Sequence, residues 1–246
     1  MDGLVMVGGF FAFVAFIIIM SIHFDRKRTK AFQAVAASMN FTFSDKASTA
    51  LLGPAHSFHL FSQGHSKKLK RVMKGVANEI DVKIFDYQYT TGHGKNSHTY
   101  IQTVILFTSD RLQLPEFTMR PENVFHKIGG AFGYQDIDFD RNPAFSKNYL
   151  LRGPSERSIR ETFTQDVLSY FESQKGICVE GKGNIVVFYR ASKKVPPHHV
   201  ATLLREGFSI FGLFAQAVAP APVAPQQEPP HDSGPSSGGV KIRMPT

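Results

Sequence analysis

The sequence predicts an α+β protein with one N-terminal transmembrane helix and a domain built on antiparallel β-hairpins, with two or three packing helices. Three observations predict this class. The chain starts with a long apolar run, and its middle holds runs of β-branched and aromatic residues around polar loops. Amphipathic helical patterns occur without a regular alternation of strand and helix. A partly closed barrel is the alternative architecture.

The first element is an uncharged run of 20 residues from Gly3 to Ile22. At 1.5 Å per residue, a helix of this length spans the ~30 Å hydrocarbon core of a bilayer. A cleaved signal peptide needs a basic start, whereas this chain starts Met1-Asp2. We therefore predict a transmembrane helix over residues 3–24, followed by a basic juxtamembrane segment over residues 25–30.

The distribution of basic residues predicts the orientation. The flank before the apolar run has no Lys or Arg, whereas the segment Asp25–Lys30 carries four of them and one acid. The positive-inside rule then places the N-terminus outside and the following domain in the cytoplasm. The single cysteine, Cys178, fits a reducing compartment.

Residues 31–214 are predicted to form the cytoplasmic domain. A short helix over Thr29–Met39 continues the anchor, and the runs Ile80–Tyr89 and Tyr100–Thr108 form a β-hairpin. Residues Leu114–Pro154 look irregular because four prolines interrupt them.

The C-terminal half predicts three further features. Ser155 caps an amphipathic helix that extends to Gln174, and a second hairpin joins Ile177–Glu180 to Ile185–Arg190. A last helix opens at Pro196-Pro197. The apolar stretch 208–219 either completes the core or lies at the membrane interface, and residues 220–246, rich in Pro, Ala, Ser and Gly, are predicted to be a disordered tail.

Two basic clusters account for the net charge of +8. The second, over residues 67–74, has five basic residues and no acid. A solvated strand edge, contact with an anionic leaflet and nucleic-acid binding are the three interpretations. The nearby anchor favours the leaflet, and the absence of interleaved aromatic residues disfavours nucleic acid. The predicted anionic-lipid contacts are Lys67, Lys68, Lys70, Arg71, Lys74, Arg26, Lys27, Arg28 and Lys30.

The polar loop between the two strands of the first hairpin is a second candidate for contact with a polar partner. It contains His93, Lys95 and Asn96, and its Gly-His-Gly-Lys string lacks the spacing of a phosphate-binding Walker loop. A hairpin connection is the favoured interpretation.

Signals for catalysis, metal or a cofactor are weak. Asp136, Asp138 and Asp140 could hold a hard cation from one face of a strand, but a solvated or ion-paired acidic face is favoured. The histidines have no zinc spacing with cysteine, and Cys178 in a strand is expected to be buried and inert. We predict no cofactor, and no catalytic residue is assigned.

Several strings resemble a family of uncharacterised bacterial single-pass membrane proteins. They are FDYQYTTGHGKNSHTYIQTV (residues 85–104), LPEFTMRPE (114–122), GYQDIDFDRNPAFSKNYLLRG (133–153) and SERSIRETF (155–163). The similarity extends over roughly residues 20–210. It implies a bacterial inner-membrane location and carries no activity.

The leading functional hypothesis is a membrane-tethered cytoplasmic module that binds protein or anionic lipid partners. The alternative is a membrane-anchored enzyme that uses a metal at the Asp136 cluster. An enzyme should have a deep pocket in which several polar side chains converge, whereas a binding module should have them scattered. These are Asp136, Asp138, Asp140, His93, His98 and Arg152.

Overall fold

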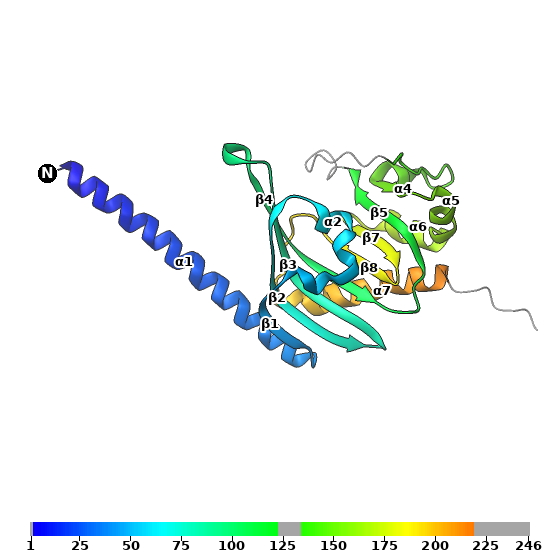
Figure 1. Ribbon diagram of the computed structural model, residues 1–246, viewed down its shortest axis with the longest axis horizontal. Coiled ribbons are helices and arrows are strands. Elements are labelled where there is room, and N and C mark those ends of the chain that lie inside the picture. The colour runs from blue at the N-terminus through cyan, green and yellow to red at the C-terminus, as the bar shows by residue number, and fades with distance from the viewer. Residues whose placement is uncertain (1, 123–133, 219–246) are drawn as a thin grey trace, which may run out of the picture.

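The computed structural model describes residues 2–122 and 134–218. Helix α1 (Asp2–Ser38) is a single continuous helix that runs far beyond the domain at its N-terminal end (Figure 1). It is long and apolar enough to cross a membrane, and apolar side chains such as Phe10, Phe13 and Ile19 are exposed along it. The helix predicted over Thr29–Met39 is confirmed as its direct continuation.

All eight strands in the described residues form one antiparallel sheet, in the order β1-β2-β3-β4-β8-β7-β5-β6. The strands are β1 (Thr42–Ala47), β2 (His65–Ala77), β3 (Ile80–Thr91), β4 (His98–Thr108), β5 (Leu114–Pro121), β6 (Tyr149–Arg152), β7 (Cys178–Gly183) and β8 (Ile185–Tyr189). The sheet stays open, with β1 and β6 at its edges. The α+β prediction is therefore confirmed, and the alternative of a partly closed barrel is wrong.

Helices cover one face of this sheet. They are the C-terminal part of α1, α4 (Pro143–Asn148), α5 (Glu156–Thr162), α6 (Gln165–Ser173), the 3₁₀ turn η3 (Pro197–His199) and α7 (Val200–Ala217). Their apolar side chains meet the sheet in a large core, with Phe163 at the centre of several aromatic contacts.

The opposite face is covered by the 3₁₀ segment η1 (Thr49–Ser57) and the short helix α2 (His59–Ser62). Strand alternation explains the two cores: Val82 and Ile84 of β3 face the helical layer, whereas Phe85 and Tyr87 face η1 and α2. Asp86 of β3 therefore points toward the helical side, where α1 lies.

Both predicted hairpins are confirmed, as β3–β4 and β7–β8. The β3–β4 turn contains the 3₁₀ turn η2 (Gly94–Asn96) and projects from the domain (Figure 1). The helix predicted over Ser155–Gln174 is wrong in extent. Ser155 does cap α5 by accepting a hydrogen bond from the Ser158 N–H, but the chain becomes extended at Thr164 and α6 starts anew.

Three further predictions concern the middle and the end of the domain. The region Leu114–Pro154 is not irregular throughout, since it contains β5, α4 and β6; Pro115 lies where the β5–β7 register is shifted, and β5 tolerates it there. The basic strand is no sheet edge, because β2 lies between β1 and β3. Of the apolar stretch 208–219, the part within α7 completes the core, and the tail 220–246 lies outside the described residues.

Candidate functional site

The most elaborate polar site in the described residues joins α1 to the sheet at Asp86. This carboxylate lies in the middle of β3 and is 1% exposed. It accepts two hydrogen bonds from Arg28 on Oδ2, at 3.0 and 2.9 Å, and one on Oδ1 at 3.1 Å. Arg71 Nε donates to Oδ2 at 2.8 Å, and the Thr103 hydroxyl donates to Oδ1 at 2.6 Å. Asp86 is thus a buried acceptor held by two strands and the anchor helix.

A bulge in β2 aims Arg71 at this carboxylate. Lys70 pairs with Asp86 and Met73 with Ile84, so β2 holds one residue more than β3 between these pairs. Arg71 takes a left-handed backbone conformation there, with φ of 51°. Such a conformation costs free energy for a side chain of this size, so it persists because Arg71 is held at both ends of its guanidinium.

The second end of Arg71 reaches back to the helix. Its Nη1 donates to Asp25 Oδ1 at 2.7 Å, and Lys70 Nζ lies 3.6 Å from Asp25 Oδ2. Partial burial raises the pKa of Asp25, but the neighbouring Arg71 and Lys70 outweigh it and lower that pKa overall. Arg28 additionally lies over the Phe32 ring, 4.7 Å from its centroid. The helix is therefore fastened at two levels, by Asp25 and by Arg28.

The structure divides the nine predicted lipid contacts into two groups. Four are engaged within the protein: Arg28 and Arg71 at Asp86, Lys70 at Asp25, and Lys67, which donates to the Phe61 carbonyl at 2.7 Å. The side chains of the other five are exposed and form no hydrogen bond or ion pair with the described residues: Arg26, Lys27, Lys30, Lys68 and Lys74. Lipid contact by the cluster remains a prediction, and the structure leaves this second group available for it.

The predicted polar loop is the tip of the β3–β4 hairpin. His93, Lys95 and Asn96 are all exposed there. His65, from the start of β2, makes a hydrogen bond with the Gly92 carbonyl at 3.0 Å, and its ring stacks on His93 with centroids 5.2 Å apart. Gly92 and Gly94 have positive φ, which lets the chain turn here. The loop is an ordered, imidazole-rich tip, and it does not approach the aspartate cluster.

The three aspartates lie on a loop before α4, not on a strand that would hold them on one face. Asp136 Oδ1 accepts hydrogen bonds from the backbone N–H groups of Ile137 and Leu151, which fixes the loop against β6. Burial raises the pKa of Asp136. Asp138 and Asp140 are exposed, and within residues 2–122 and 134–218 no group of three or more His, Cys, Asp or Glu residues could hold a metal ion.

A second buried polar cluster lies beneath α2. Glu180 of β7 accepts hydrogen bonds from the Leu60 N–H and, at 2.9 Å, from the Tyr189 hydroxyl; Arg120 lies 3.4 Å away. Burial raises the pKa of Glu180, and the Arg120 charge offsets part of that rise. Cys178 is buried beside this cluster, and burial raises the pKa of its thiol to about 12. The thiol is thus buried, as predicted from the sequence, and its raised pKa disfavours the reactive thiolate.

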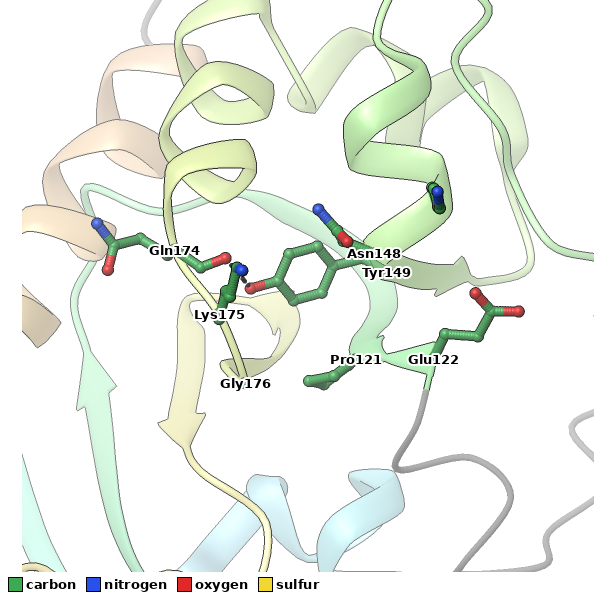
Figure 2. Close-up of a pocket in the computed structure, with 8 residues that line it drawn as sticks. Pro121, Glu122, Asn148, Tyr149, Gln174, Lys175 and Gly176 are labelled. Atoms are coloured by element: carbon green, nitrogen blue, oxygen red, sulfur yellow. Dashed lines mark hydrogen bonds between the residues drawn. The ribbon is translucent and has the colours of Figure 1, made fainter.

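A cavity of about 380 Å³ opens beside β6 and the end of α6. Figure 2 shows the Tyr149 ring at its centre, where the hydroxyl donates to the Gln174 carbonyl at 2.9 Å. Lys147, Lys175 and Glu122 complete a mixed-charge rim. None of the six residues that would mark an enzyme pocket lines this cavity. His93 and His98 lie at the hairpin tip, whereas the aspartates lie before α4 with Arg152 of β6 near enough to interact with Asp136, so the six groups fall into two separate places.

Neither buried acid, Asp86 or Glu180, is among the residues predicted from the sequence. Asp86 had a signal, because it falls at an inward position of the apolar run IDVKIFDYQY, where an acid needs a partner. Its partners, Arg28 and Arg71, look like lipid contacts in the sequence because spacing alone does not show that residues 58 and 15 positions away contact Asp86.

Comparison with known proteins shows a similar fold in one solved structure but no match to a family. No family model and no curated protein matches this chain. Among solved structures, the chain resembles the crystal structure of the mycobacterial trehalose monomycolate transport factor A, TtfA, with a TM-score of 0.56. The match covers 82% of this chain and 99% of that chain, at 12% sequence identity. Identity this low shows a shared fold and says nothing about shared residues.

Proposed function

We propose that this protein is a single-pass bacterial inner-membrane protein whose domain lies in the cytoplasm and acts as a non-catalytic module that binds protein or anionic lipid partners. The observation that carries the proposal is the α1 junction. The same helix presents an apolar surface at one end and is fastened to the sheet through Arg28 and Asp86 at the other. The anchor and the domain are therefore one body, which holds the module at a defined orientation on the membrane.

Two further observations support a binding role. The polar side chains that an enzyme would gather fall into two separate groups, the histidines at the hairpin tip and the aspartates with Arg152 beside α4 and β6, and none of them lines the cavity at Tyr149. The structural neighbour TtfA is described as a transport factor, which is consistent with a non-catalytic module. The basic flank after the apolar run supports the cytoplasmic orientation.

A topology experiment tests the location. Green fluorescent protein fused after Thr246 should fluoresce, and alkaline phosphatase fused at the same position should be inactive, because the C-terminal side stays in the cytoplasm. Active phosphatase at this position would overturn the orientation.

A lipid experiment tests the partner class. The full chain is extracted with its surrounding lipids in polymer-bounded particles, and the share of anionic lipid is measured. Changing the exposed residues Arg26, Lys27, Lys30 and Lys68 to Gln should lower this share, because each cation near the leaflet attracts anionic headgroups. Lys74→Gln is the comparison variant: Lys74 is also exposed and is one of the predicted contacts, but it lies opposite Lys83 toward the far end of β2 from His65, so it should change the share least. An unchanged share in the four-fold variant would leave protein partners as the remaining class.

A further inference from the structure

The β3–β4 hairpin points the same way as the membrane-spanning end of α1. Asp25 of α1 meets Lys70 and Arg71, and Phe41, just after α1, packs on Gly75 farther along β2, so α1 and β2 run in the same direction. Since β3 is antiparallel to β2, the end of β3 that leads to Gly92 lies toward the N-terminal end of α1. Figure 1 shows the hairpin tip projecting from the domain on that side.

The hairpin is long enough to reach the membrane surface. From the Arg28 level back to Ile22, the end of the uncharged run, six helical residues rise about 9 Å. From Asp86, which contacts Arg28, to Gly92, six strand residues extend about 20 Å. Even a strand inclined by about 45° to the helix axis advances about 14 Å along it. The tip therefore reaches the level at which α1 enters the bilayer.

The charge of this end suits a surface of anionic headgroups. No acid occurs between Asp86 and Asp110, nor between Asp45 and Glu79, so neither the hairpin tip nor the start of β2 contains one. Lys95 is exposed at the turn, the imidazoles of His93 and His98 supply further N–H donors around it, and His65 holds the turn through the Gly92 carbonyl. The opposite end of the β2–β3 pair carries acidic residues instead, Glu79 and Asp81, at its turn.

We propose that the tip of the β3–β4 hairpin, together with His65, is a second membrane-contact site that binds the phosphate groups of anionic phospholipids in the leaflet that α1 crosses. This rests on the proposed membrane anchoring and names the surface that meets the lipid. Lys95 supplies the charge, while His93 and His98 donate hydrogen bonds to phosphate oxygens. The contact and the α1 junction together fix the domain at two points.

The test places a fluorophore at the tip of the full chain in nanodiscs. Because Cys178 is buried with a raised pKa, we expect a dye to attach to Ser97→Cys at the tip or, as the matched control, to exposed Val76→Cys at the far end of β2. The quencher is a nitroxide on the lipid headgroup. In discs containing phosphatidylglycerol, we expect the Ser97 dye to be quenched at least two-fold more than the Val76 dye.

A second variant tests the chemistry. Adding Lys95→Gln and His93→Gln to the Ser97→Cys chain should reduce quenching in phosphatidylglycerol discs to the level in phosphatidylcholine discs. Equal quenching at Ser97 and Val76, or quenching of the Ser97 dye that does not depend on the lipid headgroup, would overturn the proposal. Extraction of the chain from membranes by alkaline carbonate would instead refute the anchoring on which it rests.

Discussion

Replacing Asp86 by Asn tests the junction between the anchor and the domain. The change leaves the shape of the side chain nearly intact but removes the charge that faces Arg28 and Arg71, whose side chains are 17% and 4% exposed. Breaking a buried ion pair by removing one partner costs about 3–5 kcal/mol, because the remaining charge is left uncompensated. At about 2–4 °C per kcal/mol for a domain of this size, the melting temperature should fall by roughly 10 °C.

The assay is thermal unfolding of the full chain in detergent, followed by circular dichroism. Asp81→Asn is the matched control, because Asp81 is an exposed residue of the same strand and should change stability by less than ~0.5 kcal/mol. Arg28→Ala should fall between the two variants, since Asp86 keeps Arg71 and Thr103. A fall in melting temperature no larger for Asp86→Asn than for Asp81→Asn would refute the reasoning.

Three further changes test other parts of the fold. Cys178 should react with a maleimide at pH 8 only as fast as the protein unfolds, because its pKa is raised to about 12 by burial, and rapid labelling of native protein would contradict this. Gly207→Ala should lower the free energy of unfolding by about 1–3 kcal/mol, measured by thermal unfolding, because the added Cβ would lie 2.9 Å from the Phe107 ring. Gly212→Ala in the same helix should raise stability slightly, because no atom lies within 4 Å of its added Cβ. Burial raises the pKa of Glu180, so its neutral form favours folding, and the wild type loses stability as pH rises through that pKa. Glu180→Gln should therefore gain stability relative to wild type from pH 4 to pH 8. A difference in melting temperature between the two that stays constant over this range would contradict the prediction.

Local patterns predicted the hairpins and most helices. The runs Ile80–Tyr89 and Tyr100–Thr108 pair as expected because their β-branched and aromatic residues bury both faces around a glycine-rich turn. Prolines gave a wrong prediction for Leu114–Pro154, since Pro115 and Pro121 lie at the ends of β5 and interrupt little of its ladder. The break at Thr164 was also missed, because the apolar spacing continues across it.

The candidate site was harder to predict because it depends on distant contacts. A run of lysines and arginines looks uniform in sequence, yet Arg71 turns inward through a bulge while Lys68 stays exposed. The bulge in β2 arises from its pairing with β3, and the local sequence of β2 does not show this pairing. The contact between Asp86 and Arg28 could not be predicted either, because Arg28 lies on the anchor helix, where its basic neighbours suggested the membrane surface.

One distance measurement tests most directly whether the anchor and the domain form one body. Nitroxide labels are attached to Ser21→Cys on α1 and Lys74→Cys on β2 in the full chain, both exposed positions, and pulsed electron paramagnetic resonance is recorded in nanodiscs. A single narrow distance distribution, broadened by Arg28→Ala, is the predicted result. A broad distribution in the chain with Arg28 intact would contradict the account, because it would show that the domain swings freely on its anchor.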